Sequence, residues 1–301
     1  MNYILTLVAS SGMQPLTEQH FKEIAYVIEH YNIKFTSKII WLDKKIAAEV
    51  AISGKAQSSL IAHLRETLAN DRIDFFVTKN ENRKKKLLLA DMDSTIATSE
   101  TLDELAQYAG IKDQVAEITI RAMEGKLDFH EALKERVGLL KGLKITALFA
   151  TLEETKLSLG AKTFVDTMRK TGSTCVLVSG GFTFFTDAIA TQCGFNFNHG
   201  NELEIAGDAL SGRVIPPILD KFSKLELLEN YIKDLDLTND DCLTIGDGAN
   251  DLPMLKAAGL GIGYHPKDTV KSEIANCILY GNLTAALYAQ GYSNRNMSLK
   301  D

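Results

Sequence analysis

The fold of this 301-residue chain is decided by the stretch Lys86-Leu87-Leu88-Leu89-Ala90-Asp91-Met92-Asp93-Ser94-Thr95-Ile96. Its apolar run predicts a fully buried strand that leads directly into two carboxylates. Because side chains alternate along a strand, Asp91 and Asp93 should lean to the same side at its end. Two neighbouring acids repel each other unless a cation lies between them or one keeps its proton. The stretch therefore predicts a site at the carboxyl edge of a sheet, where ligands bind in open α/β folds.

The composition is that of an ordinary globular protein and narrows the classes of partner. Hydrophobic residues make up 45% of the chain and charged residues 24%. The net charge of -6 argues against a nucleic-acid partner, because binding a phosphate backbone needs a basic face. No apolar run approaches the roughly 18 residues of a membrane span, and the N-terminus lacks the features of a signal peptide. We expect a cytoplasmic protein without nucleic-acid or membrane partners, whose scattered cysteines are small buried hydrophobes in a reducing compartment: Cys175, Cys193, Cys242 and Cys277.

Residues 1–82 form a first unit with its own pattern. Apolar periodicity predicts four strands and two helices in the order βαββαβ, at 3–9, 21–28, 37–42, 46–52, 60–68 and 73–77. This is the element order of a ferredoxin-like α+β sandwich. It resembles the ACT-type small-molecule-binding domains found on amino-acid enzymes. The role of the unit stays open between ligand binding, dimerisation into a homodimer and support of folding.

The second unit, residues 83–293, begins with the Asp91 strand and contains a long insert. A βαβ crossover takes roughly 30 residues, but the next strong strand is expected only at 174–178. The interval 97–160 has a helical pattern, so we expect a helical cap over the strand ends that excludes water when it closes. Strands and helices then alternate, which predicts an α/β fold with a doubly wound parallel sheet. The remaining residues, 294–301, form a C-terminal tail.

The elements after the cap are expected at regular intervals. Helices are predicted at 162–171, 182–193, 221–233, 251–258 and 283–290. A small hairpin is expected around 205–214, and further strands are predicted at 242–245, 260–263 and 277–280.

Polar residues at the ends of three predicted strands make up a candidate site. Ser179-Gly180-Gly181 offers a hydroxyl and two bare amides that can approach an anion closely. The run 246–251 (Gly-Asp-Gly-Ala-Asn-Asp) adds acids for an oxygen-only Mg²⁺ site beside Asp91, and Lys224 lies early in the helix before it. Each feature has an alternative explanation, because such motifs also occur in turns and calcium loops and lysines are common on solvated helix faces. Their order and placement together favour a catalytic site.

The order of these motifs and the residues in them resemble those of the haloacid dehalogenase-type phosphatases over about residues 83–293. The resemblance implies that Asp91 is the nucleophile and becomes an aspartyl phosphate. Asp93 would protonate the leaving oxygen and then deprotonate the attacking water. Mg²⁺ would be held by the Asp91 carboxylate, the Asp93 carbonyl oxygen and Asp247, with Asn250 and Asp251 in support.

The same resemblance implies how a phosphate group is bound. Ser179 and the Gly180 amide would hold phosphate oxygens, and Lys224 together with the metal would neutralise charge. A carboxylate cannot approach a phosphate dianion without such neutralisation.

The sequence of the cap, together with the motif before it, resembles that of the phosphoserine phosphatases of that superfamily. Asp-Met-Asp-Ser-Thr is followed by Glu-Thr-Leu-Asp-Glu-Leu, then by Arg-Ala-Met-Glu-Gly and Leu-Lys-Glu-Arg-Val. The resemblance implies that Glu100 and Arg136 bind the ammonium and carboxylate of phosphoserine, and that Met123 and Phe129 line the cap side of the pocket. A zwitterionic amino acid suits one acid and one base capable of bidentate bonding. The implied activity is Mg²⁺-dependent hydrolysis of O-phospho-L-serine to serine, the last step of serine biosynthesis.

Three other functions compete with this interpretation. A phosphotransferase that passes the phosphoryl group to another amino-acid hydroxyl would use the same residues. A signalling receiver domain also carries a phosphorylated aspartate at a strand end, but the insert at 97–160 argues against it. A non-catalytic amino-acid sensor would have no use for the set Asp91, Asp93, Lys224 and Asp247.

Overall fold

The computed structural model describes residues 3–10, 12–123 and 126–298, apart from the side chains of Met123 and Lys221. Its first unit consists of β1 (Tyr3–Ala9), α1 (Glu18–Glu29), β2 (Ile40–Asp43), β3 (Ala47–Ile52), α2 (Ser58–Leu68) and β4 (Ile73–Lys79). The four strands form an antiparallel sheet in the order β2-β3-β1-β4. The predicted βαββαβ order is confirmed. Strand β2 begins three residues later than expected, because the pairing with β3 starts only at Ile40.

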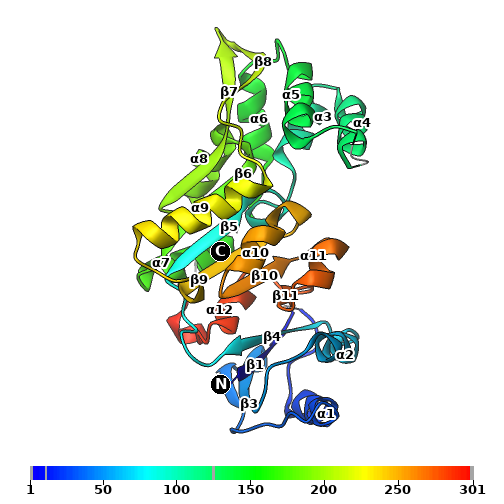
Figure 1. Cartoon of the computed structure of the whole chain (residues 1–301), viewed down its shortest axis with the longest axis vertical. Coiled ribbons are helices and arrows are strands. Elements are labelled where there is room, and N and C mark those ends of the chain that lie inside the picture. The colour runs from blue at the N-terminus through cyan, green and yellow to red at the C-terminus, as the bar shows by residue number, and fades with distance from the viewer. Residues whose placement is uncertain (1–2, 11, 124–125, 299–301) are drawn as a thin grey trace.

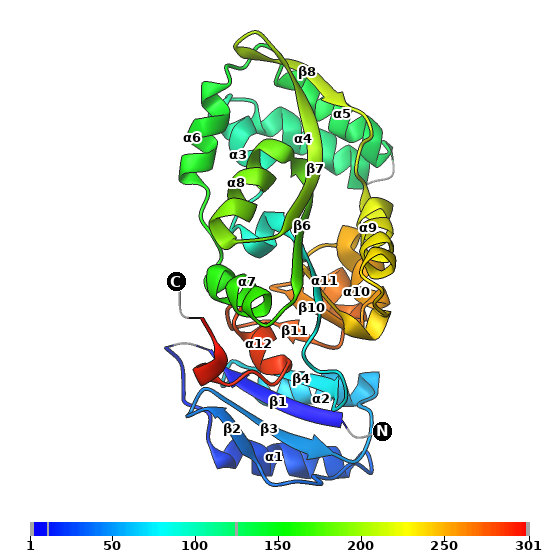
Figure 2. The ribbon, with the colours of Figure 1, turned by 90° about the vertical axis from the view of Figure 1, so that its left-hand side faces the viewer.

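The first sheet is covered on both faces (Figures 1 and 2). On one face lie α1 and α2, whose buried apolar residues include Phe21, Ile24 and Leu64. On the other face lies α12 (Ala285–Ala289) from the end of the chain, which shares a hydrophobic cluster with Val8 and Phe76. The two units are therefore joined through a common core rather than by a linker alone.

The second unit is built on a seven-stranded sheet in the order β11-β10-β9-β5-β6-β7-β8. Every neighbouring pair is parallel except the hairpin that ends the sheet. The strands are β5 (Leu87–Asp91), β6 (Thr174–Phe182), β7 (Phe197–Ala206), β8 (Ala209–Ile215), β9 (Cys242–Gly246), β10 (Leu260–Tyr264) and β11 (Cys277–Ile278). All five residues of β5 are buried. The predicted doubly wound α/β core is thus confirmed, with β5 at its centre.

The helices that flank this sheet are α7 (Ala161–Lys170), α8 (Thr183–Cys193), α9 (Lys221–Asp234), α10 (Leu252–Ala257), α11 (Asp268–Glu273) and α12. Helix α11 has no counterpart in the sequence prediction, because it is short and polar and buries only Val270. The four cysteines are buried, as expected. Among the described residues, no helix is both long and apolar enough to cross a membrane.

The cap consists of α3 (Thr101–Tyr108), α4 (Lys112–Met123), α5 (Phe129–Leu139) and α6 (Thr146–Glu154). The hairpin β7–β8 extends from the sheet to this cap (Figures 1 and 2). There the amide of Gly142 donates to the Leu210 carbonyl oxygen at 2.8 Å, and the Leu210 amide donates to Leu143 at 2.8 Å. The expected small hairpin is therefore longer than predicted and forms part of the cap.

Candidate active site

Asp91 and Lys224 meet in a buried ion pair at the carboxyl end of β5. Asp91 is 4% exposed, and the ammonium of Lys224 contacts its Oδ1 atom. The same ammonium lies 2.6 Å from Oδ1 of Asp251. Lys224 reaches this position from the first turns of α9, which Asp220 caps by accepting from two backbone amides. One cation thus serves two buried carboxylates.

The charges of this cluster shift its pKa values. Burial lowers the pKa of Lys224, but the carboxylates of Asp251 and Asp91 outweigh burial and hold the pKa above its ordinary value. Burial and the charge of Asp251 raise the pKa of Asp91, against the opposing effect of Lys224. The lysine therefore stays an ammonium, and a second cation at the cluster would offset the repulsion between carboxylates that raises the pKa of Asp91.

Three buried carboxylates form a set suited to such a cation. Oxygen atoms of Asp91, Asp247 and Asp251 lie within 4.8 Å of one another, and an oxygen-only set is what Mg²⁺ prefers. Gly246 permits this closeness, because a Cβ atom there would lie 2.4 Å from the Asp251 carboxyl carbon. The sequence prediction named Asp91, Asp93 and Asp247. The structure adds the carboxylate of Asp251, to which the motif gave only a supporting place.

Asp93 is held by three hydrogen bonds on the other side of the turn. Its Oδ1 accepts from the amide and the hydroxyl of Thr101, both at 2.8 Å, and its Oδ2 accepts from the Ser179 hydroxyl at 2.7 Å. The turn itself is tight, with Ser94 at a φ of +56°. Because Thr101 begins α3, Asp93 connects the end of β5 directly to the cap.

Ser179 lies behind the cavity wall rather than in it. Its side chain is buried, donates to Asp93 and accepts from the Gly181 amide at 2.8 Å. A Cβ atom at Gly181 would lie 3.0 Å from both Asp93 and Ser179, so a larger residue there would displace these two side chains. Gly180 and Gly181 themselves line the cavity. The serine therefore orients Asp93 in this structure.

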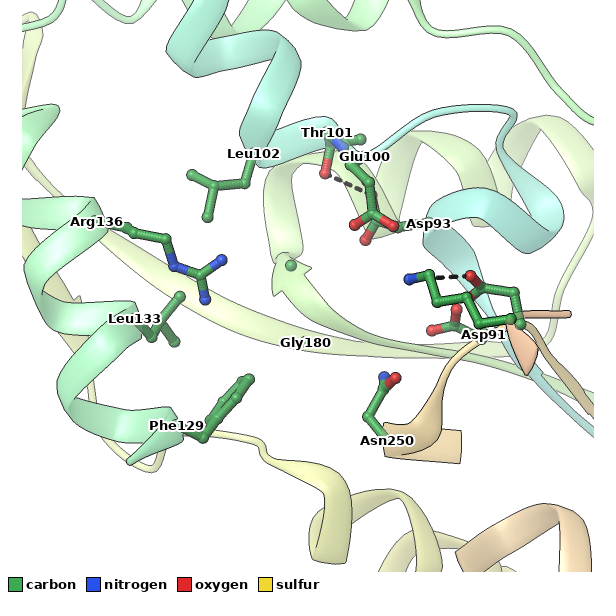
Figure 3. Close-up of a pocket in the computed structure, with 13 residues that line it drawn as sticks. Asp91, Asp93, Glu100, Thr101, Leu102, Phe129, Leu133, Arg136, Gly180 and Asn250 are labelled. Carbon is green, nitrogen blue, oxygen red and sulfur yellow. Dashed lines mark hydrogen bonds and ion pairs between the residues drawn. The ribbon is translucent and has the colours of Figure 1, made fainter. Parts of the chain in front are cut away.

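A cavity of about 160 Å³ lies between the sheet edge and the cap (Figure 3). Figure 3 shows Arg136, Leu133 and Phe129 on the cap side, facing Asp91 and Asn250 from the sheet edge. Glu100 projects into the cavity beside Asp93, and its Oε1 accepts from the Ser94 hydroxyl at 2.9 Å. The cavity thus has an acidic end at the sheet and an arginine at the cap.

Partial burial shifts the pKa values of two charged side chains of the cavity, Arg136 at the cap and Glu100 beside Asp93. It lowers the pKa of Arg136, against the charges of Asp103 and Glu100. It raises the pKa of Glu100, and the charge of Asp93 adds to that rise. Opposite charges in a ligand would offset these costs.

The structure brings most of the predicted residues to this one cavity. Those that line it are Asp91, Asp93, Glu100, Phe129, Arg136, Gly180, Asp247 and Asn250. Lys224 and Ser179 lie directly behind it, whereas the side chain of Met123 lies outside the described part of the structure. Four further residues that line the cavity were not predicted from the sequence: Thr101, Leu102, Leu133 and Lys267. Lys267 follows the carboxyl end of β10, so the rule that located the other motifs could have found it.

Comparison with known proteins places this site in a family. A family model described as haloacid dehalogenase-like hydrolase matches residues 85–259, which is more than half of the chain. The chain belongs to the haloacid dehalogenase-like hydrolases. The predicted resemblance is therefore confirmed at the level of this hydrolase family, while the ACT-like character of the first unit stays a prediction.

Several relatives of this haloacid dehalogenase-like hydrolase are described as phosphoserine phosphatases. The phosphoserine phosphatase of Archaeoglobus fulgidus is 41% identical over 202 residues, covering 67% of this chain and 59% of that protein. The phosphoserine phosphatase of Lactococcus lactis is 37% identical over 203 residues, covering 67% of this chain and 94% of that protein. The structure of a probable phosphoserine phosphatase from Vibrio cholerae matches with a TM-score of 0.79 at 27% identity, covering 98% of this chain and 88% of that one. Matched regions span 54–63% of the length of three curated relatives.

Proposed function

We propose that this hydrolase is a Mg²⁺-dependent phosphatase that converts O-phospho-L-serine and water to L-serine and phosphate. The observation that carries the proposal is the placement of Arg136 and Glu100 in one cavity with Asp91. A guanidinium suits the carboxylate of an amino acid and a carboxylate suits its ammonium, which leaves the phosphate facing Asp91. The cavity of about 160 Å³ favours a small substrate over a large one.

In the first half of the reaction, an Asp91 carboxylate oxygen attacks phosphorus and the bond from phosphorus to the serine oxygen breaks. Asp93 donates a proton to that oxygen, so serine leaves as a neutral hydroxyl. The three hydrogen bonds from Thr101 and Ser179 hold the Asp93 carboxyl in place for this transfer. An aspartyl phosphate on Asp91 results.

In the second half, water attacks the aspartyl phosphate, and Asp93, now ionised, accepts its proton. The bond from phosphorus to Asp91 breaks and inorganic phosphate leaves. The Lys224 ammonium lies against Asp91 throughout and stabilises the negative charge around it.

The carboxylates of Asp91, Asp247 and Asp251 would hold the Mg²⁺ ion, and the Asp93 carbonyl oxygen is a further proposed ligand. When bound, Mg²⁺ supplies positive charge that lets a carboxylate approach a phosphate dianion. Gly180 and Asn250 are proposed to contact the phosphate group. The Ser179 hydroxyl, which was predicted to do the same, is proposed instead to orient Asp93.

The experiment that tests the serine assignment replaces Arg136. Arg136→Ala should lower kcat/KM for O-phosphoserine about 100-fold, because a bidentate charged contact contributes roughly 3 kcal/mol. Activity on p-nitrophenyl phosphate, which has no carboxylate, should change less than about threefold. Arg121→Ala is the matched control, since Arg121 also lies on the cap but pairs with Glu135 at 2.6 Å. Equal losses on both substrates would refute the carboxylate contact.

Transfer of the phosphoryl group to another amino-acid hydroxyl is the alternative that uses the same residues. An assay with homoserine as acceptor separates the two reactions: phosphohomoserine in place of free phosphate would favour a transferase. The proposed setting is the cytoplasm, in the last step of serine biosynthesis, with phosphoserine as the small-molecule partner. The first unit is proposed to be ACT-like and to serve ligand binding or assembly of a homodimer.

A further inference from the structure

Lys267 lines the cavity and is, after Lys224, a second lysine in contact with the carboxylate cluster. Its Nζ atom lies 3.3 Å from Oδ2 of Asp247. Its backbone amide donates to the Asp247 carbonyl oxygen at 3.0 Å. The backbone and the side chain of Lys267 therefore both contact Asp247, a residue of the proposed Mg²⁺ site.

Lys267 is also the N-cap residue of α11. Its carbonyl oxygen accepts from the amides of Val270 at 2.9 Å and Lys271 at 3.0 Å. The position of the lysine at the cavity therefore depends on the position of this six-residue helix.

The other end of α11 is held by the first unit of the chain. Arg65, on α2, donates to the carbonyl oxygens of Lys271 at 2.6 Å, Ile274 at 2.7 Å and Ala275 at 3.1 Å. Carbonyl groups at the end of a helix have no partner within the helix. One guanidinium of the first unit satisfies this end of α11.

A second connection runs from β4 to His265, which lies two residues before Lys267. The buried carboxylate of Asp74 accepts from the amides of Leu279 at 2.7 Å and Gly281 at 2.8 Å. The carbonyl oxygen of Gly281 is hydrogen-bonded to Nε2 of His265 at 3.0 Å. His265 has a φ of +39°, and such a backbone persists only where its surroundings fix it. The first unit thus holds the residues after Lys267 directly, through Arg65, and the residue His265 before it indirectly, through Asp74 and Gly281.

We propose that Lys267 is a positioning residue of the active site and that the first unit fixes it there through Arg65 and α11. The inference rests on the proposed phosphatase function of the same cavity. Among the residues that the structure describes, four carboxylates line this cavity, namely Asp91, Asp93, Glu100 and Asp247. The Lys267 ammonium offsets the charge of Asp247 and lowers the repulsion that an entering phosphate meets. Since the lysine side chain is 60% exposed, solvent limits the effect to about three- to fivefold in affinity.

The test measures the Kd of inorganic phosphate by calorimetry in the presence of Mg²⁺, together with kcat and KM for O-phosphoserine. Lys267→Met should raise Kd and KM about three- to fivefold and change kcat less than twofold. Lys267→Arg should restore most of the affinity, because it keeps the charge. An unchanged Kd in Lys267→Met would refute the positioning role.

The link to the first unit is tested with Arg65→Met. This variant should raise Kd by about twofold or more, and combining it with Lys267→Met should add nothing beyond the single lysine variant. Lys79→Met is the matched control, because Lys79 also crosses between the units, to Asp240 at 2.9 Å, without contacting α11. A lower Tm in Arg65→Met with an unchanged Kd would overturn the link.

The proposed function is tested separately by the unmodified chain. A chain that hydrolyses no O-phosphoserine, but whose phosphate affinity still depends on Lys267 and Arg65, would refute the function and support the inference. An active chain whose phosphate affinity depends on neither residue would support the proposed function and refute the inference.

Discussion

Replacing Lys224 with methionine should destabilise the protein strongly, beyond any effect on turnover. The lysine is 2% exposed and contacts two buried carboxylates, those of Asp91 and Asp251. Methionine has a similar length but no charge, so Lys224→Met leaves two buried acids without their cation. Removing one partner of a buried ion pair costs about 3–5 kcal/mol. For a unit of this size, that loss corresponds to a fall in Tm of roughly 6–20 °C.

The fall in Tm is measured by differential scanning calorimetry in EDTA, so that no divalent cation can replace the ammonium. Lys233→Met is the control, because Lys233 is an exposed lysine in the last turn of the same helix. Adding Mg²⁺ should recover part of the Tm of Lys224→Met, since the ion would offset the same carboxylates. A Tm within about 2 °C of the control would refute the conclusion that this ammonium neutralises the cluster.

Three further predictions follow from the same contacts. Ser179→Ala should lower kcat about 10- to 100-fold, because Asp93 loses a charge-assisted hydrogen bond worth about 1.5–3 kcal/mol; steady-state kinetics that show an unchanged kcat would contradict the orienting role. Burial raises the pKa of Asp74 to about 6, so the stability that its protonated form contributes is full below about pH 4 and is lost as the pH rises through about 6. The advantage of the wild type over Asp74→Asn in free energy of unfolding should therefore shrink by roughly 2–3 kcal/mol between pH 4 and pH 7. Unfolding is followed by the fluorescence of Trp41, the single tryptophan, and a difference that stays constant with pH would be the contrary result. Removing divalent cations with EDTA should abolish phosphate release and lower Tm, and Mg²⁺ should restore both; activity that persists in EDTA would rule out the proposed metal site.

Much of the site could be predicted from the sequence because it follows a local rule. Parallel strands bring their carboxyl ends to one edge of a sheet, so the motifs after β5, β6 and β9 had to meet once those strands were recognised. The buried run before Asp91 made β5 easy to recognise. The helical pattern of the insert likewise identified the cap, and with it Arg136.

What could not be predicted depends on contacts between distant parts of the chain. The short polar segment Asp268–Glu273 has no sequence pattern that indicates a helix. Its end is stabilised by a distant residue, since Arg65 of the first unit donates to the carbonyl oxygens of Lys271 and Ile274. The role of Lys267 depends in turn on that helix. The motif also could not show that the Ser179 hydroxyl binds Asp93 or that the Asp251 carboxylate joins the cluster, since both depend on side-chain orientation.

The substrate assignment is tested by phosphate release by the unmodified chain in the presence of Mg²⁺. The substrates are O-phosphoserine, phosphothreonine and a sugar phosphate, at equal concentrations. We expect release from O-phosphoserine with a kcat/KM at least about tenfold above the others, because Arg136 and Glu100 contact the amino-acid groups and the small cavity disfavours an added methyl group. Equal release from all three, or release from the sugar phosphate alone, would contradict the proposed substrate.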